Sequence, residues 1–283
     1  MGINKTVFLI STGLLVLAAG FAIVLHERKE SYQKNISDNV QIDQTWELPD
    51  QLDEISGIAF LDDERLACIQ DEKGKIYVYN LASKKIEKKI TFADDGDYEG
   101  IAVAGNTAYV VKSNGTLYEV KNFMEDPETE EFETFLDADN NVEGLFFDKE
   151  KQRLWLVPKE EDPESKNYKG VYAFDIKNRQ LVKEPVFKLT FGGKAMEDVQ
   201  DEDVEDRFFP SEINRNPSTG QVVLLEGTDS KLLLLNEFGQ VTKLYVLDRD
   251  LFPQPEGLAY DHDGNLYISN EGNPATIHRV ILK

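Results

Sequence analysis

The side chains with the clearest chemical potential in this sequence are carboxylates that recur at a constant spacing. Five short segments share a marker resembling EGIA, and in four of them the residue before the marker glycine is matched by a polar residue 15 positions later. These pairs are Ser56 with Asp71, Glu99 with Asn114, Ser211 with Glu226 and Glu256 with Glu271; in the remaining segment a longer hairpin separates Glu143 from Glu160 by 17 residues. Seven of the ten positions are acidic: Asp71, Glu99, Glu143, Glu160, Glu226, Glu256 and Glu271.

Carboxylates held close together either take up protons or bind a cation. Several glutamates, with Asn114 as a carbonyl donor, provide the hard oxygen ligands that suit Ca²⁺. Because the set contains no histidine or cysteine, it does not suit Zn²⁺ or Cu²⁺. The sequence therefore predicts a Ca²⁺ site. The alternative is a wide, hydrated surface on which an acidic chain has placed some glutamates without any ligand.

Other polar segments carry weaker signals. The acidic run 195–206 lacks the spacing and central glycine of an EF-hand and is interpreted as a solvated loop. The segment DHDGN at 261–265 resembles part of a calcium loop, but its position favours a hairpin turn, with His262 exposed in it. No catalytic residue is assigned, because neither Ser56 nor Ser211 has a histidine at a defined spacing.

Composition excludes several classes of protein. The 283 residues contain 31 Lys and Arg against 53 Asp and Glu, a formal charge of −22, which argues against nucleic-acid binding. The single cysteine, Cys68, forbids an intrachain disulfide. Only three histidines are present (His26, His262 and His278), too few for a histidine-rich metal site, and His278 is interpreted as structural.

The repeated marker also predicts the elements that would position these carboxylates. Aligned on the glycine, or on Glu212 where glycine is replaced, the markers lie at 57, 100, 144, 212 and 257. Each opens a short alternating strand, a turn and further strands, which is typical of a β-propeller blade of four antiparallel strands. We expect an all-β, five-bladed propeller, with six blades and a β-sandwich as the alternatives. The segment 40–48 should close the ring by supplying the outer strand of the last blade.

In such a ring the marker residues and the ends of the second strands meet at one mouth of the central channel.

The first thirty residues have a different character. Residues 6–25 form an uncharged apolar stretch of 20, long enough for a transmembrane helix. We expect 1–30 to be a membrane anchor, with a cleaved signal segment as the alternative, 31–42 to be a linker and 43–283 to be the propeller. The acidic propeller should lie outside the cytoplasm, in the periplasm or cell envelope.

The sequence resembles the SdiA-regulated (YjiK-like) family of bacterial membrane-associated propellers, which are distantly related to NHL-repeat propellers. The motifs that carry the resemblance are DYEGIAV, NVEGLFF, LVPKEEDP, LLEGTDSKLLLLNEFGQV and FPQPEGLAYDHDGNLYISNEGN, within about 43–283. The resemblance implies calcium binding at a shared site and no established enzymatic activity. The matching acidic positions are Glu99, Glu143, Glu160, Glu226, Glu256 and Glu271. The chain departs from the family at VVKSNG, around Asn114, and in the acidic insertion 195–206.

Two functions remain open from the sequence. The first is a non-catalytic, membrane-tethered propeller in which Ca²⁺ orders a mouth that binds a protein or a small-molecule ligand. The second is a Ca²⁺-dependent hydrolase of lactones or phosphoesters, by analogy with propeller lactonases and phytases. The analogy of fold is a weak warrant, and few basic residues lie near the expected site to hold a phosphate.

Overall fold

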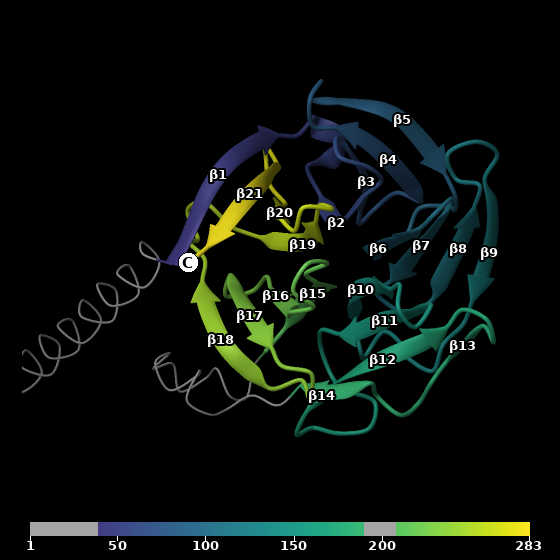
Figure 1. The fold of residues 1–283 in the computed structure, drawn as a ribbon. Coiled ribbons are helices and arrows are strands. Elements are labelled where there is room, and N and C mark those ends of the chain that lie inside the picture. The colour runs from purple at the N-terminus through teal and green to yellow at the C-terminus, as the bar shows by residue number, and fades with distance from the viewer. Residues whose placement is uncertain (1–38, 190–207) are drawn as a thin grey trace, which may run out of the picture.

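The alternating hydrophobic segments of the sequence form antiparallel strands that are arranged in five sheets around a central axis (Figure 1). The computed structural model describes residues 39–189 and 208–283. Each sheet is one blade, and the strands of a blade follow one another from the axis to the rim. The prediction of a five-bladed β-propeller is confirmed, and the six-bladed alternative was wrong.

Blades 1 and 2 are consecutive in the chain. Blade 1 contains β2 (Ile55–Phe60), β3 (Arg65–Gln70), β4 (Lys75–Asn80) and β5 (Lys85–Thr91), preceded by the 3-10 helix η1 (Asp50–Leu52). Blade 2 contains β6 (Tyr98–Ala104), β7 (Thr107–Lys112), β8 (Leu117–Lys121) and β9 (Glu128–Phe132).

Blades 3 and 4 are separated in the sequence by residues 190–207, and the predicted acidic run 195–206 therefore lies outside the described residues. Blade 3 contains β10 (Val142–Asp148), β11 (Arg153–Pro158), β12 (Lys169–Asp175), β13 (Gln180–Leu181) and β14 (Phe187–Leu189), which also pairs with β12. Blade 4 contains β15 (Pro210–Arg215), β16 (Val222–Glu226), β17 (Lys231–Leu235) and β18 (Val241–Val246).

Blade 5 joins the two ends of the described chain. It contains β19 (Pro255–Tyr260), β20 (Leu266–Asn270), β21 (Thr276–Leu282) and, as its outer strand, β1 (Val40–Glu47) (Figure 1). The register of β1 against β21 runs from Val40 opposite Leu282 to Glu47 opposite Thr276. The predicted ring closure is confirmed, although β1 begins at Val40, inside the expected linker 31–42.

The predicted anchor 1–30 lies outside the described residues. Among residues 39–189 and 208–283, no helix is both long enough and apolar enough to cross a membrane.

The hydrophobic core is divided among the interfaces between adjacent blades. Side chains alternate between the two faces of each strand. In β3, for example, Leu66 and Cys68 pack toward blade 5, whereas Ala67 and Ile69 pack toward blade 2. Second strands are covered on both faces in this way, which explains why they read as continuous hydrophobic runs rather than as alternating ones.

The marker glycines lie where the innermost strands of neighbouring blades approach each other. These strands contact in the cyclic order β2, β6, β10, β15, β19 and back to β2 (Figure 1). A Cβ on Gly100 would lie 2.5 Å from the carbonyl oxygen of Glu143, and one on Gly257 would lie 2.6 Å from that of Ser56. Only glycine leaves room for backbones this close. At Gly144 the corresponding gap is wider, with the nearest backbone atom 3.2 Å away at the nitrogen of Ile213.

We therefore expect Gly100→Ala to cost about 2–3 kcal/mol of unfolding free energy, because the added methyl must displace backbone atoms of the next blade. The matched control is Gly144→Ala, which occupies the same place in the repeat and should cost less than about 1 kcal/mol, because the gap there is larger. Denaturant unfolding of the full-length protein measures both. Equal losses at the two positions would contradict the close-approach explanation.

Candidate functional site

The residue before each marker glycine, or before Glu212 in the fourth marker, brings a polar side chain to the axis. These five residues are Ser56, Glu99, Glu143, Ser211 and Glu256. Because the glycines hold neighbouring inner strands in contact, the three glutamates lie within electrostatic range of one another. Both Glu143 and Glu256 raise the pKa of Glu99, after the larger effect of its burial. Carboxyl groups from blades 2, 3 and 5 thus converge at one mouth of the channel.

The residues that follow the second strands form a neighbouring layer. The backbone N–H groups of Asp71, Ser113, Lys159 and Glu271 donate to equivalent carbonyl oxygens, those of Glu54, Asp97, Asn141 and Gln254, at 2.8–3.2 Å. The sequence predicts Asn114 and Glu160 at these places in blades 2 and 3. The structure places Ser113 and Lys159 there instead, because the β6–β7 hairpin is one residue shorter, and the β10–β11 hairpin one residue longer, than the corresponding hairpins of blades 1 and 5.

A similar shift of one residue places Glu226 one position before the layer that contains Asp71 and Glu271. It lies directly opposite Pro210 in blade 4, as Gln70 lies opposite Ile55 and Asn270 opposite Pro255. Glu226 is fully buried between blades 3 and 4, where its Oε2 is 3.8 Å from the Nζ of Lys231 and its Oε1 accepts the N–H of Asp229. It therefore belongs to a different layer from Asp71 and Glu271.

Burial and mutual repulsion raise the pKa of the converging carboxyl groups. Desolvation, followed by Glu143, Asp97 and Glu256, raises the pKa of Glu99 to about 9. Desolvation also raises the pKa of Glu143 to about 8, although the nearby Lys159 opposes it. The pKa values of Glu256 and Asp71 are raised mainly by desolvation. The pKa of Glu271 rises to about 7 through desolvation and the neighbouring Glu54. The mouth therefore disfavours the fully ionised state.

Two lysines of blade 3 lie among these carboxylates. The Nζ of Lys159 is 2.8 Å from the Oε1 of Glu143, which also accepts the side-chain amide of Asn141 at 3.1 Å. The Nζ of Lys169 donates to the carbonyl oxygen of Lys159 and lies 5.0 Å from the ring centre of Phe209. Burial lowers the pKa of Lys169 to about 8, even though Glu160, Glu226 and Glu143 oppose that shift.

The donor set of the mouth fits a hard cation in its chemistry but not in its arrangement. Its atoms are oxygens, and two of them, the Oδ1 of Asp71 and the Oε2 of Glu143, are buried without a hydrogen-bond partner within the described part of the chain. Unpaired buried carboxylate oxygens are costly, which favours a further cationic partner. No group of three or more Asp, Glu, His or Cys in the described residues is gathered closely enough to hold a metal ion.

Glu212 is an acidic residue that the sequence shows only as a departure from the marker. It is fully buried, and its Oε1 accepts the N–H groups of Leu145 and Ile213, both at 2.8 Å. Burial raises its pKa well above the ordinary value. Its carboxyl group thus links the backbone of β10 to that of β15, one residue after Gly144. The replacement of glycine at the fourth marker was the signal for this bridge between blades.

The two histidines within the described residues, His262 and His278, and the DHDGN segment make local structural contacts. His278 is buried in β21, where its ring nitrogens lie 2.9 Å from the Oγ1 of Thr45 and 3.1 Å from the carbonyl oxygen of Leu251. His262 is exposed, with its Nδ1 2.7 Å from Asp63. The 261–265 segment is the turn between β19 and β20, and the carboxylate of Asp261 accepts the backbone and amide N–H groups of Asn265. The hairpin interpretation is confirmed.

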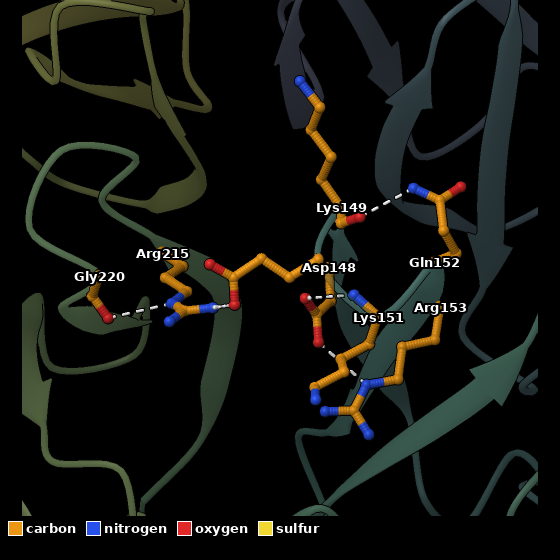
Figure 2. A network of polar contacts seen from close by, with 8 residues as sticks. Asp148, Lys149, Lys151, Gln152, Arg153, Arg215 and Gly220 are labelled. Atoms are coloured by element: carbon orange, nitrogen blue, oxygen red, sulfur yellow. Dashed lines mark hydrogen bonds and ion pairs between the residues drawn. The ribbon is translucent and has the colours of Figure 1, made fainter.

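A second concave region lies between the first hairpins of blades 3 and 4. It is a cleft of about 900 Å³ lined by residues 146–150, 214–220 and 260. Figure 2 shows its polar contacts: Arg215 donates to the carbonyl oxygen of Gly220 at 3.1 Å, and Asp148 accepts the Nε of Arg153 at 2.9 Å. The guanidinium of Arg215 also lies 3.0 Å from Glu150. These charges are paired with one another, so the cleft lacks the concentration of one sign found at the mouth.

Comparison with known proteins identifies a family and a fold. The family model described as SdiA-regulated matches residues 32–278. A search among curated proteins finds no match. Glutaminyl cyclase from Myxococcus xanthus is similar in structure, with a TM-score of 0.63 at 12% identity over 86% of this chain and 96% of that one. A streptogramin B lyase has a TM-score of 0.52 at 11% identity over 87% and 98%. At these identities the likeness concerns the fold alone.

The raised pKa of Glu99 makes the metal-free protein less stable as pH rises. The folded state keeps a proton on this carboxyl up to about pH 9, whereas the unfolded chain releases it near 4.5. Between these values the native state binds more protons, so this carboxyl alone should make the unfolding free energy fall with increasing pH by up to about 1.4 kcal/mol per unit. Thermal unfolding in EDTA across this range measures the slope.

The variant Glu99→Gln should reduce that slope, because the amide does not ionise, while Glu143 and Glu271 keep their own contributions. Glu237→Gln, an exposed change in the turn between β17 and β18, removes the same charge away from the axis and should leave the slope as it is in the original protein. A slope unaffected by Glu99→Gln would show that this carboxyl is not the group responsible.

Proposed function

This chain belongs to the SdiA-regulated family, and from that premise we propose that it is a membrane-tethered binding module outside the cytoplasm, whose channel mouth binds Ca²⁺ and receives a protein or small-molecule ligand. The observation that carries the proposal is the convergence of Glu99, Glu143 and Glu256 from three blades, with raised pKa values and a buried, unpartnered carboxylate oxygen. Asp71 and Glu271 flank them.

Calcium suits this set of residues because it accepts six to eight oxygen ligands in a flexible arrangement. A divalent ion at the mouth would neutralise the repulsion that now keeps protons on the carboxyl groups. It would also link inner strands of different blades, and so stiffen the edge of the channel where a ligand would dock. Glu160, which is exposed, and Glu226, which is paired with Lys231, have less support as ligands than the other five.

The tether rests on the N-terminal sequence and on where the propeller begins. The apolar stretch 6–25 precedes a short polar segment that leads into β1. Since β1 is the outer strand of blade 5, the polypeptide enters the propeller at its rim rather than near the channel (Figure 1). An anchor attached there leaves the mouth free.

A Ca²⁺-dependent hydrolase of lactones or phosphoesters is the alternative function. The cations nearest the mouth are engaged, since Lys159 pairs with Glu143 and Lys169 donates to the carbonyl oxygen of Lys159. A phosphate would have to displace these contacts. Propellers of similar fold include a cyclase and a lyase, so the fold does not choose between binding and catalysis. Turnover of lactones or phosphoesters above background with Ca²⁺ present would favour the enzyme.

Addition of Ca²⁺ should stabilise the EDTA-treated, full-length protein in detergent micelles. Saturation at one hundred times the Kd adds about 2.7 kcal/mol, which raises the Tm by several degrees for a domain of this size. The variant Glu256→Gln should lose this shift, because it removes a ligand charge, whereas Glu237→Gln should retain it. An unchanged Tm in the original protein would refute Ca²⁺ binding.

A further inference from the structure

The position of Lys159 in the repeat is occupied by acidic residues in two other blades. Its N–H donates to the carbonyl oxygen of Asn141 just as those of Asp71 and Glu271 donate to Glu54 and Gln254. Equivalent backbone contacts place the three side chains at equivalent points around the axis. Blade 3 therefore contributes a positive charge where blades 1 and 5 contribute negative ones.

The ammonium group of Lys159 lies among the glutamates that converge at the mouth. It forms a short ion pair with Glu143, at 2.8 Å, and the side chains of the pair are 20% and 5% exposed. Glu256 and Glu99 also interact with it electrostatically, so carboxyl groups from three blades share one lysine. Such a shielded pair is far less screened by water than a surface salt bridge.

The same contacts account for the incomplete fit of the mouth to a metal ion. Lys159 uses the Oε1 of Glu143, while the Oε2 of that carboxylate stays buried without a partner. One ammonium group cannot satisfy several carboxylates from different directions, and no three of the described acidic residues lie close enough together to hold a metal ion. In this arrangement the glutamates of the mouth already have a cationic partner that belongs to the protein.

We propose that the ε-ammonium of Lys159 is the resident cation of the acidic mouth, and that a divalent ion binds there by displacing it from Glu143. The second part rests on the proposed function. Lys159 then sets the affinity of the site: it weakens divalent binding by competition, and it holds the ring together when the metal is absent. On displacement the ammonium group moves toward solvent, and the Oε1 of Glu143 becomes free to act as a ligand.

The test uses Ca²⁺ itself, titrated calorimetrically into the full-length protein in detergent micelles after removal of metal with EDTA. The variant Lys159→Met keeps an unbranched side chain, one atom shorter, but removes its charge, and it should lower the Kd for Ca²⁺ about tenfold or more. Lys159→Arg keeps a cation and should resemble the original protein. Lys149→Met removes a lysine from the β10–β11 hairpin on the far side of blade 3 and serves as the matched control.

Thermal unfolding in EDTA provides a second readout that does not depend on the metal. Lys159→Met should lower the metal-free Tm by more than about 5 °C, because it leaves a buried carboxylate without its partner. The double variant Lys159→Met/Glu143→Gln should recover most of that loss, since it removes the stranded charge as well. A loss that the double variant does not recover would indicate a packing role and would overturn the inference.

The outcomes separate the inference from the proposed function. Equal Ca²⁺ affinities in the original protein and Lys159→Met overturn the displacement, while the Ca²⁺ site itself stands. No Ca²⁺ binding by either protein overturns the proposed function and the displacement together. In that case the Tm in EDTA decides whether Lys159 is the resident cation: a recoverable loss supports it, and no loss refutes it.

Discussion

The close approach of the five innermost strands is the constraint on which the other features of this propeller depend. At Gly100 and Gly257 the next blade's backbone lies so near that a single methyl group would overlap it. The residue before each marker glycine is thereby carried to the axis, whatever its chemistry. The hydrophobic interfaces between blades hold the strands there, because each blade buries both of its faces against neighbours.

An electrostatic problem follows from that geometry. Three glutamates at the axis cannot all be ionised at low cost in a partly desolvated site. Two features of the described residues reduce this repulsion. The carboxyl groups keep protons to higher pH, as at Glu99, and Lys159 contributes a positive charge from blade 3. A bound divalent ion would be a third way to reduce the repulsion. The three compete, so proton uptake, the lysine and Ca²⁺ should influence one another at this mouth.

Ring closure links this site to the N-terminal segment. The outer strand of blade 5 comes from residues 40–47, far from β21 in sequence but hydrogen-bonded to it along its length. Closing the ring in this way pairs the outer edge of β21 and holds blade 5, which carries Glu256 and Glu271, against blade 1. A pull on the N-terminus would thus act on the rim of the blade that contributes two of the acidic side chains.

By itself the sequence determined the number of blades, the closing strand and the identity of the glutamates before the marker glycines. These features are local: marker, hairpin and hydrophobic period lie within one repeat and can be read in order. Only the tertiary structure decided that Lys159 rather than Glu160 faces Glu143, that Glu226 is buried beside Lys231, and that Glu212 bridges blades 3 and 4. For Lys159 and Glu226 the physical reason is that one residue more or fewer in a hairpin shifts the second strand by one position, and since successive side chains point to opposite faces, such a shift exchanges the residue that faces the axis.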